Sequence, residues 1–287
     1  MGIKRLVLTA LAGLALAGSL NLADPPQDAE EVGTETCALC HDELAAKFAT
    51  NIHQRSNPEG SCEGCHGAGS AHTEEADPNL IRRFGSGTAA TATNATCNSC
   101  HGGDRGHRNW DRAEHKEGGL ACTSCHAVHE PATPAGLLAK TSPELCYTCH
   151  AEVRAAFLLP ERHPVDQGGI DCSDCHNPHE AGQRRLLGGF KQADCLSCHS
   201  EYRGPWFFEH QAVAVEGCTS CHTPHGSVNR HLLNYQRVSD LCLQCHPSQP
   251  FFHVAADGAG ERTTAINDCT RCHTQIHGSN NDALFLR

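Results

Sequence analysis

Hydrophobic residues are thinly scattered along this chain, and they recur at helical spacing in only a few short stretches. Two such stretches are residues 41–53, HDELAAKFATNIH, and residues 150–163, HAEVRAAFLLPERH, which end near Asn or Pro and predict short α-helices. Elsewhere 27 glycines, 14 prolines and turns such as NPH and TPH predict loops. Because no stretch alternates hydrophobic and polar residues as strands do, we expect a mostly irregular fold with short α-helices.

The one long hydrophobic run lies at the N-terminus. Lys4 and Arg5 precede an apolar stretch that extends to Leu20, and small residues follow it, as is typical of a secretory signal peptide. A membrane anchor is the competing interpretation, but the stretch is shorter than the roughly 20 residues that a transmembrane helix needs. We therefore expect residues 1–23 to be a cleaved signal peptide and residues 24–287 to form the exported protein.

A long insertion lies between His72 and Thr96 and is low in complexity toward its C-terminal end. It is predicted to form a surface loop. A docking element for a partner is the alternative.

The cysteines add specific chemistry to this outline. The chain has 20 cysteines, and each belongs to a Cys-x-x-Cys pair that is followed at once by His. Such pairs serve disulfides, zinc or iron–sulfur sites, and covalent haem c, for which C-x-x-C-H is the attachment signature. Because zinc and iron–sulfur sites do not need a His directly after every pair, ten such motifs in ten pairs favour haem c.

Each motif is predicted to bind one haem, through two thioethers and a proximal His. The predicted thioether cysteines are Cys37, Cys40, Cys62, Cys65, Cys97, Cys100, Cys122, Cys125, Cys146, Cys149, Cys172, Cys175, Cys195, Cys198, Cys218, Cys221, Cys242, Cys245, Cys269 and Cys272. The predicted proximal ligands of the iron are His41, His66, His101, His126, His150, His176, His199, His222, His246 and His273.

The sixth ligand of each iron is also predicted to be His. Met1 is the only methionine, and its loss with the signal peptide excludes the His/Met ligation that raises the potential of other cytochromes c. The ten motif histidines leave twelve of the 22 in the chain. Ten bis-histidine irons are therefore possible, with two histidines to spare.

An internal repeat indicates which two are spare. Five repeats, beginning at Cys37, Cys97, Cys146, Cys195 and Cys242, each contain a first motif, a mid-repeat His, a second motif and a trailing His. The mid-repeat histidines are His53, His115, His163, His210 and His253, and the trailing ones are His72, His129, His179, His225 and His277; these ten are the predicted distal ligands. His107 and His231 fit neither position and are expected to lie at the surface.

The chain's reach limits how these ligands pair. His179 follows His176 by three residues, which span at most about 11 Å, so His179 can hardly cross to the opposite face of its own haem. We expect a trailing His to bind the first haem of its repeat and the mid-repeat His to bind the second, which makes each repeat a closed two-haem module. Exchange of ligands between repeats is the alternative.

The low hydrophobic content indicates what forms the core. Residues 24–287 serve ten haems, and only 5% of the chain is aromatic. We expect the haems to form the core, so that folding requires them, in an elongated multihaem cytochrome c of five stacked repeats. Arg82, Arg83, Arg184 and Arg185 are candidate partners for haem propionates, with solvated charges as the alternative.

The chain resembles the MtrA/PioA/DmsE family of periplasmic decahaem cytochromes over essentially all of residues 24–287. The motifs that carry the resemblance are ETCALCHDE, CEGCHGAGSAH, CHNPHE, CHTPHG and the C-terminal CHTQIHGSNNDALFLR. Two departures are Ala68, where proline is common, and Asn281, where the family often has His. Neither is a predicted ligand, so they bear on the subfamily alone.

The resemblance implies a periplasmic cytochrome, associated with the outer membrane, that threads into a β-barrel porin. It implies electron transfer from a periplasmic or inner-membrane cytochrome to an extracellular multihaem cytochrome or reductase, or the reverse flow during iron oxidation. The net charge of −11 argues against a nucleic-acid partner.

Two other functions compete with this conduit. One is a freely diffusing periplasmic electron shuttle with the same haems. The other is a multihaem reductase, which generally needs an iron without a distal ligand, often at a modified motif such as C-x-x-C-K; here all ten motifs end in His. We expect an electron-transfer protein rather than an enzyme.

Overall fold

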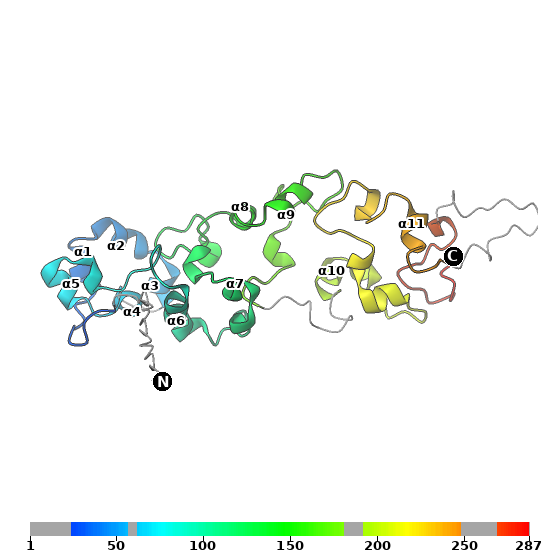
Figure 1. The fold of residues 1–287 in the computed structure, drawn as a ribbon. Helices are drawn as coiled ribbons and strands as arrows, with labels where there is room; N and C mark the ends of the chain where they lie inside the picture. The colour runs from blue at the N-terminus through cyan, green and yellow to red at the C-terminus, as the bar shows by residue number, and fades with distance from the viewer. Residues whose placement is uncertain (1–23, 57–61, 181–191, 248–268, 287) are drawn as a thin grey trace, which may run out of the picture. The chain divides into compact units, whose positions relative to one another are not determined.

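The computed structural model describes residues 24–56, 62–180, 192–247 and 269–286 of the chain. Figure 1 shows short helices separated by long loops. The predicted signal peptide, His253, Arg184 and Arg185 lie outside the described residues.

The α-helices of the described part are short, and the longest, α6, has 12 residues. They are α1 (Thr34–Ala38), α2 (Asp42–Phe48), α3 (Ile52–Ser56), α4 (Glu63–His66), α5 (Ser70–Glu75), α6 (Ala90–His101), α7 (Glu114–Glu117), α8 (Ser142–Tyr147), α9 (Ala151–Ala156), α10 (Ala193–Cys198) and α11 (Val238–Cys242). Helical turns add η1 (Pro78–Leu80), η2 (Trp110–Arg112), η3 (Cys122–Ser124), η4 (Ala135–Leu137), η5 (Cys172–Asp174), η8 (Ser200–Tyr202), η9 (Ala212–Glu216), η10 (Cys218–Ser220), η11 (Arg230–Leu232) and η14 (Cys269–Arg271). The described residues contain isolated β-bridges, such as Glu161 with Ser227, but no strand.

Each motif is built on a single helical turn. The backbone N–H of the motif His donates to the carbonyl of the first Cys four residues earlier, as from His150 to Cys146 and from His222 to Cys218, both at 3.0 Å. Residues three and four apart lie on the same face of such a turn. The Cys-x-x-Cys-His spacing therefore presents both thiols and the imidazole on one side, where a porphyrin can meet all three.

The predicted helices are confirmed, and the predicted surface loop is only partly correct, because residues 76–89 form a loop with one helical turn while both ends of the insertion are helical. Residues 41–53 contain α2 and the start of α3, and residues 150–163 contain α9. The end of the insertion, by contrast, belongs to α6, in which Thr93 is 1% exposed and Asn94 is 6% exposed. The alanines of this low-complexity run are strong helix formers, and the helix that they begin continues through the third motif.

Protein side chains supply only a small hydrophobic core. Among the described residues, the buried hydrophobic ones are Trp110, Ala113, Tyr147, Phe157 and Val165. Tyr147, Phe157 and Val165 pack into one cluster, and the Tyr147 hydroxyl donates to Asp166 Oδ1 at 2.8 Å. This sparse core fits a fold whose interior is made largely by haem.

The chain divides into two compact units. The first comprises residues 1–100 with 121–124, and the second comprises residues 101–120 with 125–287. Within the described residues, no helix is both long enough and apolar enough to span a bilayer.

Candidate haem-binding sites

The cysteine thiols of neighbouring motifs approach one another. All 20 cysteines lie in the described residues and have free thiols. The first cysteines of the two motifs in a repeat share side-chain hydrogen bonds, in the pairs Cys37–Cys62, Cys97–Cys122, Cys146–Cys172 and Cys195–Cys218. Burial and the neighbouring Cys62 thiol raise the pKa of Cys37 to about 11. The two attachment points of each of these four repeats are therefore neighbours.

Attachment points of successive repeats are close as well. In the first compact unit, burial and the nearby Cys100 thiol of the third motif raise the pKa of Cys65 in the second. In the second compact unit, burial together with the Cys125 thiol raises the pKa of Cys146, and burial together with the Cys195 thiol raises that of Cys175. Within each compact unit, these neighbouring attachment points follow one another in the order of the sequence.

Motif histidines face histidines from outside the motifs at a recurrent spacing. Apart from His101–His107, which is described below, seven such pairs have ring centroids 5.8–6.4 Å apart: His41–His72, His115–His150, His126–His179, His163–His199, His176–His225, His210–His246 and His222–His277. Two metal–nitrogen bonds of about 2 Å each account for most of this separation, and the two ring radii account for the rest. The pairs therefore fit two axial ligands of one iron.

Hydrogen bonds fix which nitrogen faces the metal. Backbone carbonyls accept from the Nδ1 atoms of the motif histidines His66, His126, His222 and His273, at 2.6–2.8 Å. The same holds for His72, His115 and His163 outside the motifs, at 2.7–3.1 Å. A carbonyl only accepts, so Nδ1 carries the proton and Nε2 keeps its lone pair for a metal. Hydrogen bonds of this kind orient an imidazole for ligation of haem iron.

The pairing differs from the one predicted within repeats. His72 and His41 belong to one repeat, but the other six pairs join two consecutive repeats. A mid-repeat His such as His115 faces the first motif of the next repeat, at His150. A trailing His such as His179 faces the second motif of the preceding repeat, at His126. The geometry follows the alternative, in which repeats exchange ligands.

The residue before each trailing His explains this exchange. His115 Nδ1 donates to the carbonyl of Pro178 at 3.1 Å, and Pro178 precedes His179. His163 Nδ1 donates to the carbonyl of Pro224 at 2.7 Å in the same way, next to His225. The His210 imidazole hydrogen-bonds to the backbone of Ile276, next to His277. These three mid-repeat histidines are thus held against the turns that present the reciprocal ligands. In the first two cases the carbonyl belongs to the proline of a CHxPH sequence, a role that sequence reasoning missed.

Burial favours the neutral form of the trailing histidines His179, His225 and His277. Desolvation, with added repulsion from neighbouring histidines such as His107, lowers the pKa of His179 to about 4. Desolvation likewise lowers the pKa values of His225 and His277 below the usual value for His. A neutral imidazole is the form that binds a metal.

The two spare histidines differ in their surroundings. His231 is exposed, as expected, and it contributes its backbone carbonyl, which accepts from His222 Nδ1 at 2.8 Å. The expectation of a surface position is wrong for His107. Its side chain is 30% exposed, and its ring lies 4.1 Å from the ring of His179.

His101 has a carboxylate where motif histidines such as His126 and His222 have a carbonyl. Its Nδ1 donates to Asp104 Oδ2 at 2.7 Å, and this hydrogen bond holds the pKa of Asp104 below its usual value. The same oxygen lies 4.0 Å from His107 Nδ1. His107, with its ring 5.9 Å from that of His101, therefore faces the side of His101 that is turned away from a metal at Nε2.

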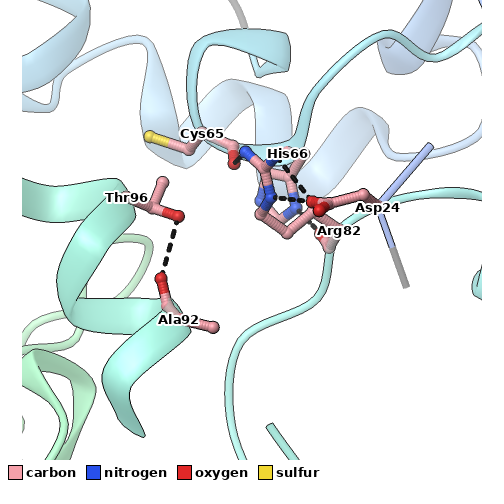
Figure 2. Close-up of polar contacts among 6 residues, drawn as sticks. All are labelled: Asp24, Cys65, His66, Arg82, Ala92 and Thr96. Atoms are coloured by element: carbon pink, nitrogen blue, oxygen red, sulfur yellow. Dashed lines mark hydrogen bonds and ion pairs between the residues drawn. The ribbon is translucent and has the colours of Figure 1, made fainter. Parts of the chain in front are cut away.

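The second motif is held by two charged residues of the first compact unit. Figure 2 shows the Arg82 guanidinium against Asp24, to which it donates at 2.7 and 2.9 Å, and the Arg82 carbonyl at His66 Nδ1. Arg82 also donates to the Cys65 carbonyl at 3.2 Å. That Arg82 binds a haem propionate stays a prediction. In the structure its guanidinium contacts Asp24 and the Cys65 carbonyl.

Glu63, inside the second motif, is a further residue that sequence reasoning missed. Its side chain is buried, and its carboxylate accepts from the backbone N–H groups of Val32, Gly33 and Gly69 at 2.8–2.9 Å. On α6, Asn94 has a similar role, because its Oδ1 accepts from the Cys122 N–H at 2.8 Å.

Two further predicted distal ligands, His53 and His129, lie in the described residues. His53 lies in α3, with Nδ1 3.2 Å from Asn51 Oδ1, and His129 lies half-buried in the turn after the fourth motif. Their ligand roles, like that of His253, stay predictions.

Comparison with known proteins places the chain among multihaem cytochromes. A family model described as a doubled CXXCH motif matches residues 114–155, 163–204 and 210–251. Each match joins the second motif of one repeat to the first motif of the next, and so includes an exchanged pair such as His115 and His150. Motifs of this type carry covalently bound haem c, and 20 cysteines provide for ten haems.

The chain is also 34% identical over 267 residues to "Multiheme cytochrome MtrA" of Shewanella baltica (strain OS185), a match that covers 86% of this chain and 79% of the relative. Identity at this level over most of both chains, together with the repeated doubled motif, assigns the family. The chain belongs to the MtrA family of multihaem cytochromes.

Proposed function

We propose that this protein is a periplasmic electron conduit that carries electrons through ten bis-histidine haems between the periplasm and the cell exterior, inside an outer-membrane porin. The observation that carries the proposal is the chain-ordered row of neighbouring attachment points, from Cys37 to Cys122 and from Cys125 to Cys218. Neighbouring redox centres allow an electron to move stepwise without leaving the protein.

The chain's own residues hold each centre in place. The haems supply reversible one-electron chemistry at iron. The motif cysteines anchor them, the paired imidazoles supply two neutral nitrogen ligands to each iron, and the Nδ1 hydrogen bonds fix the ring orientations. Ligands that are fixed before and after electron transfer leave little to rearrange, which favours conduction over substrate binding.

Saturation of the irons distinguishes this function from a reductase. Seven imidazole pairs with the spacing of axial ligands support two His ligands at each of those irons. The ten distal ligands are proposed to be His53, His72, His115, His129, His163, His179, His210, His225, His253 and His277. The relative's name, a multihaem cytochrome, supports electron transfer as well.

The location and the partners are part of the proposal. The N-terminal segment has the pattern of a signal peptide, which supports export to the periplasm, where haem c is attached. A cytochrome of the periplasm or inner membrane then donates electrons, and an extracellular multihaem cytochrome or reductase accepts them, with the reverse direction open to iron oxidation.

The decisive experiment uses lipid vesicles that contain a redox dye and carry the cytochrome together with its porin. A reductant added outside is expected to reduce the enclosed dye only when both proteins are present. Cys122→Ser with Cys125→Ser, which removes one haem from the middle of the row, is expected to stop this transfer while the remaining haems still react with dithionite.

His231→Asn is the matched control, because only the backbone of this exposed residue contacts His222. It is expected to conduct as the unaltered protein does. A cytochrome that never binds the barrel, yet exchanges electrons with soluble partners, would show the freely diffusing shuttle instead.

A further inference from the structure

Motif histidines have two kinds of partner at Nδ1. In four of the five second motifs, Nδ1 faces a neutral backbone carbonyl: at His66, His126, His222 and His273. In three of the five first motifs, Nδ1 faces a carboxylate: Asp104 at His101, Glu152 at His150 and Glu201 at His199. These carboxylates come two or three residues after the motif His, on the turn that leaves the motif.

The contact at His101 is the closest of the three. Asp104 Oδ2 lies 2.7 Å from His101 Nδ1 and makes a hydrogen bond. The corresponding oxygens of Glu152 and Glu201 lie 3.6 Å away, within ion-pair distance. His107 Nδ1, at 4.0 Å, is the other titratable group that faces Asp104.

A carboxylate acts on an imidazole ligand differently from a carbonyl. Because it is charged, it forms a stronger hydrogen bond and draws the Nδ1 proton further from the ring. The ring becomes a more basic ligand, which stabilises ferric iron more than ferrous iron and lowers the reduction potential.

We propose that Asp104 is a positioning residue that lowers the reduction potential of the haem at Cys97 and Cys100, relative to haems whose proximal Nδ1 faces a carbonyl. Glu152 and Glu201 act in the same direction, more weakly, on the haems at Cys146 and Cys195. This inference rests on the His ligation in the proposed function. It places the haems at Cys97, Cys146 and Cys195 lower in potential than those at Cys122 and Cys218, whose proximal histidines face carbonyls, so this part of the row has no single downhill direction.

The test is Asp104→Asn in the haem-loaded protein. Asn keeps an oxygen that accepts from Nδ1 and removes the charge. One of the ten one-electron couples in a potentiometric titration is expected to move to higher potential, and the electron paramagnetic resonance signal of one low-spin haem is expected to shift with it. A tenfold change in the ferric-to-ferrous preference corresponds to about 59 mV.

Asp111→Asn is the matched control, since it removes the same charge nearby. Asp111 is 89% exposed and pairs with Lys116 at 3.5 Å. A shift in Asp104→Asn no larger than that in Asp111→Asn would overturn the proposal, because it would then be a general charge effect. Asp104→Glu, which retains the carboxylate, is expected to keep the lower potential.

Two further measurements keep the outcome clear. Mass analysis counts the attached haems. If Asp104→Asn carries fewer than ten haems, Glu152→Gln and Glu201→Gln replace it as the test. An upward shift in the potential of one couple in each variant supports the proposal, and no shift in either overturns it. Low-spin spectra and conduction in vesicles test the proposed function separately. If both are retained while no variant changes a potential, this inference fails and the proposed function stands.

Discussion

His107 and His179 have ring centroids 4.1 Å apart, yet their surroundings assign them different roles. The ring of His179 faces that of His126 at 5.8 Å and at an angle of 17°. His107 instead packs on His179 from outside and faces Asp104. At the scale of single residues, proximity to a haem site therefore does not make a histidine a ligand; the direction in which its nitrogens point does.

This difference predicts opposite effects for two alanine substitutions. His179→Ala is expected to leave one of ten irons without a distal ligand, which appears as one high-spin haem that binds carbon monoxide when reduced. His107→Ala is expected to leave all ten low-spin. His231→Asn serves as the control, because its φ of 59° suits Asn better than a branched residue. A high-spin haem in His107→Ala would contradict the assignment.

The sequence predicted the attachment residues but not how the ligands pair. The C-x-x-C-H motif is local, since five consecutive residues on one helical turn meet one porphyrin. The clamp on His115, by contrast, comes from Pro178, 63 residues away. Spacing alone cannot say whether such a trailing turn folds back on its own repeat or reaches the preceding one.

At the scale of elements, close backbone approach holds the short segments together. Gly226, directly after His225, lies against the end of α9, where a Cβ atom would meet the Ala156 carbonyl oxygen and carbon. Glu161 and Ser227 exchange two backbone hydrogen bonds, at 2.8 and 3.1 Å, beside this contact. Only glycine fits at position 226, and this fixes where His225 lies relative to His176.

Gly226→Ala is therefore expected to push the His225 turn away from α9. The steric strain should cost about 1–3 kcal/mol, and the haem of His176 should become partly high-spin. Denaturant titration and electron paramagnetic resonance measure the two effects. Gly103→Ala is the control, since nothing lies within 4 Å of a Cβ atom there; equal effects in both variants would contradict the packing argument.

Glu63→Gln tests the anchoring of the N-terminal segment to the second motif. An amide group has one acceptor oxygen instead of two, so at least one of the N–H groups of Val32, Gly33 and Gly69 loses its partner. The expected cost is about 1–3 kcal/mol, with faster hydrogen exchange at these three amides. Exposed Glu74, changed to Gln, should leave the exchange rates unchanged.

Helices with clear periodicity could be predicted, and α6 could not. The Ala/Thr sequence of α6 has no hydrophobic residues at helical spacing, so its pattern predicts a loop rather than a helix. What makes it helical and buried is a tertiary contact, from Asn94 to the backbone of Cys122, which a sequence pattern does not reveal.

At the scale of the whole molecule, the small side-chain core means that folding should depend on haem. Expression without haem attachment is expected to give a chain with little helical signal in far-ultraviolet circular dichroism and rapid cleavage by protease. The haem-loaded protein is the comparison. An apo chain with the helicity and protease resistance of the loaded protein would contradict the expectation.

The exchange of histidines between repeats also has a consequence for how such chains can change in length. Removal of a segment cut at arbitrary points would leave one histidine without its iron and one iron without its distal histidine at each junction. Removal or duplication of one whole repeat, cut at equivalent positions such as His115 and His163, would bring an equivalent histidine to each such iron. Evolution can therefore shorten or extend the array only in steps of two haems.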